Sequence, residues 1–220
     1  MINLTLASLF LPLSHFLISS TGLRAVLLRH LGETGYTRAY SMLAFAALGW
    51  LIWAHELAPV RPLWAAPVWT VYVLAPVILV SGILAVGGLS TPNPVIVRSE
   101  RLFAQPDIVR GVLRVTRNPF FWGAGLFALA QIAVLGTLAA MLSFGSVAVL
   151  GIAGALILDA KKARKHGGAW EAFASATSDI PFLAIFQGRQ RLSLREIGWR
   201  RMAIGAGVCF ATLLGDQMRR

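Results

Sequence analysis

Residues 120–158 read FFWGAGLFALAQIAVLGTLAAMLSFGSVAVLGIAGALIL, and this stretch contains no charged side chain. A helix that crosses the hydrocarbon core of a bilayer needs about 20 mostly apolar residues. The stretch is therefore long enough for two spans, and Gly136-Thr137 supplies a tight turn between them. These features predict a helical hairpin inside a membrane.

Four further apolar stretches lie on either side of this hairpin. They are residues 2–20, 41–57, 68–89 and 202–214. The last is short, and it reaches across a bilayer only if it starts near Ile197 or runs into Gln217. We therefore expect an all-α chain that forms one integral membrane domain over residues 1–220. The domain is predicted to be a polytopic transmembrane helical bundle with five to six spans.

The composition excludes the other broad classes of protein. Hydrophobic residues make up 57% of the chain and charged residues only 13%, whereas a soluble domain usually carries about 25% charged residues. The single cysteine, Cys209, excludes an intramolecular disulfide framework and a metal site built on a cysteine cluster. No basic residue precedes the first apolar stretch, so we interpret it as a membrane helix and not as a cleaved signal.

The formal charge of +11 is distributed unevenly along the chain. Of the 20 Lys and Arg residues, 17 fall in residues 21–40, 90–118 and 160–201, which are alternate connections between the predicted helices. Basic loops stay in the cytoplasm, so the N-terminus is expected to face outward. We expect a location in a bacterial inner membrane and contact with membrane lipids. The charge then reflects topology, and no nucleic-acid partner is needed to explain it.

Two polar segments between the predicted helices also show patterns. Residues 106–116 alternate apolar and basic side chains, which suggests either an amphipathic helix on the membrane surface or an ordinary basic loop. Residues 170–190 mix aromatic and polar side chains, and we expect this segment to fold back against the inner face.

Polar side chains inside membrane spans are costly and are functional candidates by default. The candidates are His15, His55, Gln131 and Asp159. A neutral imidazole is a good ligand for iron, so two histidines from different helices could hold a haem. Each histidine could instead simply bond to a neighbouring helix. By helix rise, His55 and Gln131 lie at matching depth, and His15 lies nearer the cytoplasm.

Several short stretches resemble the NnrU family, which includes the zeta-carotene isomerases of plants and cyanobacteria. The resemblance begins with His15 and runs through nearly the whole chain. Its parts are Gly22-Leu23-Arg24, Gly32-Glu33 with Tyr36 and Tyr40, His55, Thr116-Arg117-x-Pro119, Gly123, Ala128-Leu129-Ala130, Trp170-Glu171-Ala172-Phe173, Pro181-Phe182-x-Ala184 and Gly188-Arg189-Gln190. The order and spacing of these parts carry the resemblance more than any one of them.

The resemblance implies an integral membrane protein that binds haem b, with a redox or carotenoid cis–trans isomerase-like role. An apolar polyene would then be the substrate. His15 matches a proposed axial ligand and His55 a second important histidine. Gln131 stands where the family has its other proposed axial ligand, and Asn118 replaces the histidine of Arg-His-Pro. Three options follow: haem on His15 alone, haem on His15 and His55, or no haem.

Two alternatives come from other resemblances. The Arg-x-Pro hairpin and the polar stretch after it also resemble isoprenylcysteine carboxyl methyltransferases, which implies a site for S-adenosylmethionine near Arg117, Asp159 and Glu171. Arg117 could otherwise anchor lipid phosphates. The bacterial NnrU branch is linked to denitrification, so a non-catalytic protein partner of a respiratory complex is the third reading.

Overall fold

The computed structural model describes residues 1–96, 99–105 and 107–218. Its α-helices are α1 (Ile2–Ser20), α2 (Leu23–Glu56), α3 (Trp69–Ser90), α4 (Pro119–Leu135), α5 (Leu138–His166), α6 (Gly168–Ala176), α7 (Leu183–Phe186), α8 (Leu194–Ile197) and α9 (Trp199–Met218), and two short 3₁₀ helices are η1 (Glu100–Ala104) and η2 (Gly111–Arg114). The described residues contain no strand beyond one isolated bridge between Pro62 and Thr137. The all-α prediction is therefore confirmed.

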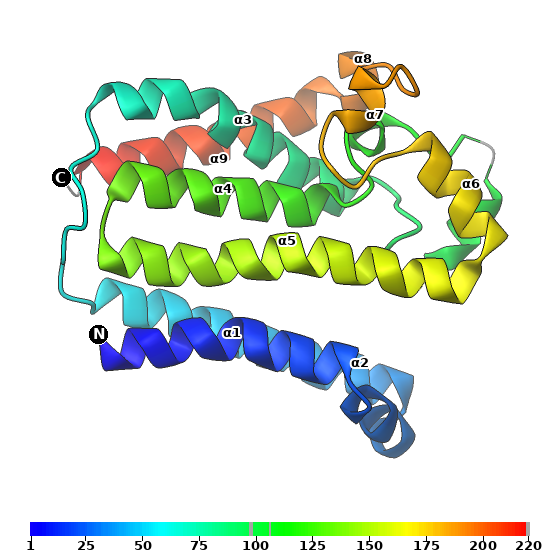
Figure 1. The fold of residues 1–220 in the computed structure, drawn as a ribbon, viewed down its shortest axis with the longest axis horizontal. Helices are drawn as coiled ribbons and strands as arrows, with labels where there is room; N and C mark the ends of the chain where they lie inside the picture. Colours follow the sequence, from blue (N-terminus) through cyan, green and yellow to red (C-terminus); the bar gives the residue numbers. More distant parts are fainter. Residues whose placement is uncertain (97–98, 106, 219–220) are drawn as a thin grey trace.

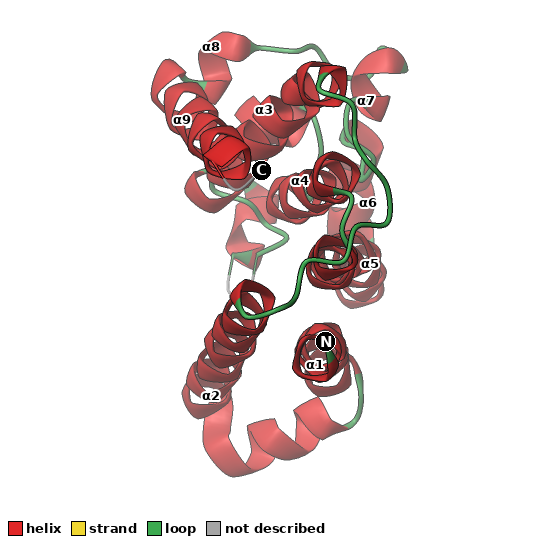
Figure 2. Cartoon of the chain, turned by 90° about the vertical axis from the view of Figure 1, so that its left-hand side faces the viewer, coloured by secondary structure: helices red, strands yellow, loops and turns green. Residues whose placement is uncertain are grey.

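Six long helices lie side by side in the order α9, α3, α4, α5, α1 and α2 (Figure 1 and Figure 2). The α4–α5 hairpin occupies the middle of this arrangement, α3 and α9 pack on one side of it, and α1 and α2 on the other. Apolar side chains of α1, α2 and α5 form one buried cluster. The hairpin is thus the element that joins the two halves of the bundle.

The predicted hairpin is confirmed, with its turn at Gly136-Thr137. Gly136 ends α4 in the left-handed region, with φ of 59°, which glycine adopts at little cost. Thr137 caps α5, because its hydroxyl accepts a hydrogen bond from the backbone N–H of Ala140 at 3.1 Å. A side chain at position 136 would also collide with Trp64 from the connection between α2 and α3.

Glycines bring neighbouring helices of the bundle close together. A Cβ atom at Gly123 would lie 2.6 Å from the backbone nitrogen of Ala85 on α3. Within the hairpin, a Cβ at Gly151 of α5 would lie 2.7 Å from the carbonyl oxygen of Phe121 on α4. Small residues allow such close backbone approach, which is a common packing mode between membrane helices.

Three helices are long and apolar enough to cross a membrane, namely α1, α3 and α5, and α4 is a shorter apolar helix. The chain is therefore an integral membrane protein. The count of five to six spans stays a prediction, because α2 carries basic residues in its first half and α9 is mixed in composition.

Residues 21–40 differ from the expected polar loop, since most of them belong to α2. The helix is bent at Gly32, where φ is 65°. A residue other than glycine rarely adopts this conformation, so the bend depends on this position. A search for apolar stretches did not find this helical segment, because it contains basic side chains.

All three basic connections lie at one end of the bundle, on the right in Figure 1. The first half of α2, the described parts of the α3–α4 connection (residues 91–96, 99–105 and 107–118) and the α6–α8 region lie there. Met1 and the end of α9 lie at the opposite end. The structure thus confirms that the alternating charge follows the topology. The cytoplasmic orientation of the basic end stays a prediction.

Of the two readings left open for residues 106–116, the described part forms a connection with one short 3₁₀ helix and not an amphipathic surface helix. Pro106 itself lies outside the described residues. Ile108, Val112 and Leu113 are buried, and only η2 is regular. The apolar face packs against the protein and not against lipid. The expected fold-back of residues 170–190 is confirmed, because Trp170 and Phe173 pack into a buried cluster with Ile108.

Candidate functional site

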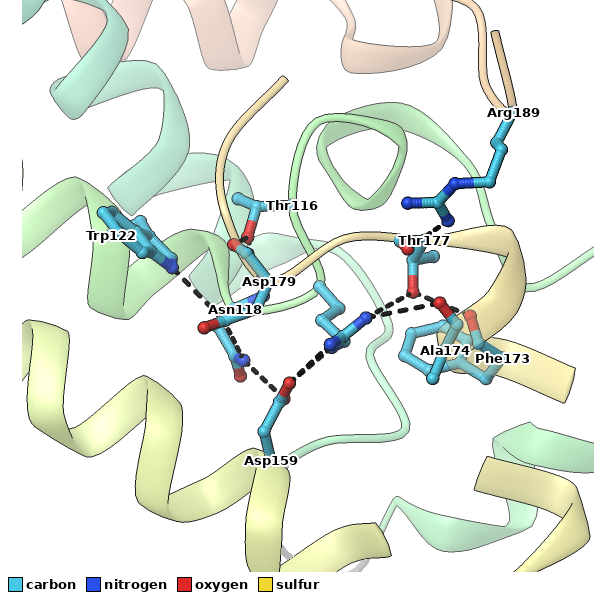
Figure 3. Close-up of polar contacts among 10 residues, drawn as sticks. Thr116, Asn118, Trp122, Asp159, Phe173, Ala174, Thr177, Asp179 and Arg189 are labelled. Carbon is cyan, nitrogen blue, oxygen red and sulfur yellow. Dashed lines mark hydrogen bonds and ion pairs between the residues drawn. The ribbon is translucent and has the colours of Figure 1, made fainter. Parts of the chain in front are cut away.

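A buried ion pair lies at the basic end of the bundle, between the start of α4 and the last turns of α5 (Figure 3). The Nε and Nη2 atoms of Arg117 donate to Asp159 Oδ2 at 2.7 and 2.6 Å. The two side chains are only 15% and 16% exposed. The Arg117 guanidinium also lies 5.4 Å from the ring centroid of Trp170, and its Nη1 contacts Thr177 Oγ1 at 3.5 Å.

Asn118 links this ion pair to a second carboxylate. Its Nδ2 donates to Asp159 Oδ1 at 2.8 Å and to Asp179 Oδ1 at 2.7 Å. Trp122 donates to the same oxygen of Asp179 at 3.2 Å. Asn118 Oδ1 and Asp179 Oδ2 are buried and have no hydrogen-bond partner among the described residues. The cluster therefore ties the α4–α5 hairpin to the segment that follows α6 (Figure 3).

In this structure Arg117 and Asp159 are bound to each other. Their expected roles toward S-adenosylmethionine, and that of Arg117 toward lipid phosphates, stay predictions. Glu171, the third candidate for that cofactor, is exposed on α6. Sequence reasoning missed Asp179, whose only signal was an acidic residue just before Pro181-Phe182.

A second network holds the end of α6. Arg189 Nη1 donates to the carbonyl oxygens of Ser175 and Thr177, both at 2.6 Å. Gln190 donates to the carbonyl oxygen of Ala176 at 2.9 Å and accepts from Arg114 at 2.8 Å. The Gly188-Arg189-Gln190 stretch thus satisfies the last carbonyls of a helix, which otherwise lack partners.

Arg114 also forms a two-pronged pair with Glu196 on α8. Its Nε and Nη2 donate to the two carboxylate oxygens at 2.8 and 2.9 Å. The backbone N–H of Gly111 donates to Glu196 Oε2 at 2.9 Å. The hydrogen bonds from Arg114 and then from Gly111 hold the pKa of Glu196 below its ordinary value. The pair joins η2 to α8 at the protein surface.

The depressed pKa of Glu196 predicts a pH dependence of stability. The ionised carboxylate stabilises the folded state at neutral pH, and this contribution is lost as the pH falls below the ordinary glutamate value of 4.5 and through the lower folded value. Since Glu196 is 35% exposed, solvent screening limits the contribution to about 1 kcal/mol or less. Melting temperatures of wild type and Glu196→Gln should therefore differ at pH 7 and converge in acid. Glu171→Gln, at an exposed position, is the control. A difference in melting temperature between wild type and Glu196→Gln that stays constant with pH would contradict the prediction.

His15 lies on α1 near the same end of the bundle. Its Nδ1 lies 2.8 Å from the carbonyl oxygen of Leu11. A carbonyl can only accept, so Nδ1 is the donor in this contact, and in the neutral tautomer Nε2 is then the nitrogen with the lone pair. The half-buried ring lies edge-on to Tyr40, with centroids 5.4 Å apart, and Tyr40 stacks on Tyr36 at 5.9 Å.

Basic side chains surround this aromatic group. The Arg24 guanidinium lies 5.6 Å from the centroid of the Tyr36 ring. Lys161 on α5 donates to the carbonyl oxygen of Ser19 at 2.7 Å, and the charges of Arg24 and Arg164 act on it. Arg24 of α2 thus approaches the His15 region through the Tyr36–Tyr40 pair, and Lys161 of α5 through Ser19 at the end of α1.

The structure does not bring His55 to His15. Tyr40 lies beside His15, and His55 comes 15 residues later on α2, or about 22 Å farther along the helix. The Nδ1 of His55 lies 2.8 Å from the hydroxyl of Ser143 near the start of α5, and its ring lies edge-on to Phe144. Haem coordinated by His15 and His55 together does not fit this arrangement.

Gln131 is 1% exposed on α4 and lies at the level of His55. The contact between Gly125 and Ile152 sets the register of α4 against α5. Measured from this contact toward the hairpin turn, Gln131 lies about 9 Å along α4. Ser143, which contacts His55, lies about 13 Å along α5 in the same direction. The expected match in depth between Gln131 and His55 is therefore confirmed, and Gln131 lies far along the bundle from His15. Within the described residues, no group of three or more His, Cys, Asp or Glu side chains could hold a metal ion.

The comparisons with known proteins agree with the resemblance in the sequence. The model of the NnrU protein family matches residues 3–216. The chain is also 40% identical over 83 residues to the 15-cis-zeta-carotene isomerase, chloroplastic, of Arabidopsis thaliana. That match covers 37% of this chain and 22% of the isomerase. No solved structure matches the chain.

Proposed function

Because the chain belongs to the NnrU family, we propose that it has an isomerase-like role on an apolar polyene in the membrane and that His15 holds haem b. In this proposal α2, α4 and α9 cross the bilayer with α1, α3 and α5, which gives six spans. The observation that carries the proposal is the geometry of His15, whose hydrogen bond to Leu11 leaves Nε2 open to a metal.

The surroundings of His15 suit a haem group held by one histidine. A hydrogen bond from the second ring nitrogen to a carbonyl orients a metal-binding imidazole and raises its basicity. Tyr36 and Tyr40 supply flat aromatic surface beside the ring. Arg24 and Lys161 supply positive charge for the two carboxylates of haem b at the membrane boundary.

Bound haem would supply an iron with an open coordination position. The chain would orient this group through His15, hold its carboxylates at the basic end and exclude water along α1. Leu13 and Leu17 are more than half exposed and lie on the face of α1 opposite His15. An apolar polyene dissolved in the bilayer would meet this apolar face of α1 first.

The absorption spectrum of protein purified from haem-replete cells tests the proposal. We expect a Soret band for the wild type and for His55→Ala, and its loss for His15→Ala. His55 is a matched control because it is also half-buried and bonded, but it lies at the other end of the bundle. Gel filtration confirms that each variant is folded.

Three outcomes would contradict the haem site. They are a wild-type spectrum without a Soret band that stays unchanged when haemin is added, a His15→Ala variant that keeps the band, and loss of the band in His55→Ala alone. A missing Soret band would favour the alternative that the chain is a non-catalytic partner of a denitrification or other respiratory complex. That alternative stays a prediction.

A further inference from the structure

A pocket of about 320 Å³ opens between the end of α3 and the start of α9, away from His15. It is lined by Thr91, Pro92, Arg110, Gly111, Glu196 and Arg201. A neighbouring pocket lined by residues 198–201 shares Arg201 with it. The end of α3 and the start of α9 lie at the basic end of the bundle (Figure 1).

The pocket carries positive charge that the protein does not neutralise. Arg201 donates to Ser90 Oγ at 2.8 Å and to the carbonyl oxygens of Ser90 and Ile197 at 3.3 and 3.0 Å, all of them neutral acceptors. Arg110 is exposed. Within the described part of the chain, neither arginine pairs with a carboxylate. Glu196 is the one acid in the lining, and Arg114 already neutralises it.

The rim of the pocket has the character of a membrane boundary. Trp199 is 71% exposed and Leu89 is 72% exposed. Exposed apolar side chains continue from the rim along α9, among them Ile204 and Val208. Tryptophan prefers the headgroup level of a bilayer, so Trp199 places the arginines at the depth of lipid phosphates.

We propose that this pocket binds the phosphate of an anionic phospholipid, with the acyl chains lying against α3 and α9. Guanidinium groups bind phosphate oxygens by paired, charge-assisted hydrogen bonds. The three bonds to neutral groups hold the Arg201 guanidinium in place before the lipid arrives, so little side-chain freedom is lost on binding. The apolar surface that continues from the rim favours a lipid over free phosphate. This inference does not depend on haem at His15.

Native mass spectrometry of the full chain in detergent, titrated with phosphatidylglycerol, tests the proposal. We expect Arg110→Gln to weaken binding of the first lipid about tenfold, the effect of losing one charge-assisted hydrogen bond. Arg201→Gln should weaken it at least as much. The Arg110 side chain is exposed and forms no ion pair with another described residue. Arg201→Gln also loses its bonds to Ser90 and could unfold the protein. Arg110→Gln tests the site in that case too.

The matched controls are Arg191→Gln and Arg195→Gln, which remove the same charge from exposed positions at the same end of the bundle. These variants should bind the lipid like the wild type. Equal weakening by all four substitutions would overturn the proposal in favour of diffuse attraction, and so would unchanged binding by Arg110→Gln. Phosphatidylcholine and inorganic phosphate are separate arms, and binding of either as tightly as phosphatidylglycerol would overturn an anionic lipid site.

Discussion

Replacing Arg117 with alanine is expected to destabilise the folded protein by about 3–5 kcal/mol, the cost of leaving a buried charge without its partner. Asp159 is only 16% exposed, and its carboxylate shares Asn118 with a second carboxylate, that of Asp179. Without the guanidinium, two negative groups would lie buried together. The temperature or detergent midpoint of unfolding should fall strongly, and Arg117→Lys should lose less because it retains a charge.

Arg114→Ala is the matched control for Arg117→Ala. It also breaks an arginine–carboxylate pair at the basic end, but its partner Glu196 is 35% exposed and can be hydrated. We expect a loss of about 1 kcal/mol or less. Similar losses for the two variants would show that the Arg117 pair is not insulated from water, and this prediction would then be wrong.

Gly123→Ala is expected to destabilise the bundle by about 1–3 kcal/mol, because one added methyl group must push two backbones apart. The new Cβ would lie 2.6 Å from the nitrogen of Ala85 and 2.7 Å from the carbonyl oxygen of Ser81, both on α3. Backbone atoms cannot rotate away as a side chain can. The whole of α3 would therefore have to move relative to α4.

Gly145→Ala on α5 is the control for this substitution, since a Cβ at Gly145 would meet nothing within 4 Å. Alanine is the better helix former by about 1 kcal/mol, so this variant should unfold at the same midpoint as the wild type or at a higher one. Gly123→Ala at or above the wild-type midpoint would contradict the close packing of α3 and α4.

The amino-acid sequence predicted the fold correctly where a single strong local pattern, such as an uncharged run or alternating charge, determines the structure. The uncharged run of residues 120–158 predicted the hairpin and its turn, because no other structure accommodates so many apolar residues. Alternating charge predicted which connections share one end of the bundle. The half-basic start of α2 was missed, because a helix at a membrane boundary need not be apolar. For residues 106–116 the sequence left a surface helix and a loop both open, because an apolar face looks the same whether it meets lipid or protein.

For the candidate sites, the sequence determined which residues are chemically unusual, and the tertiary structure decided what they do. His15, His55 and Gln131 stand out among apolar neighbours by residue type alone. The structure places Tyr40 beside His15, and His55 lies about 22 Å farther along α2 from Tyr40. Asp179 joins Asp159 through Asn118 although 19 residues of chain lie between the two acids. Such contacts depend on how helices pack, and packing depends on the sum of many weak contacts that no short stretch of sequence contains.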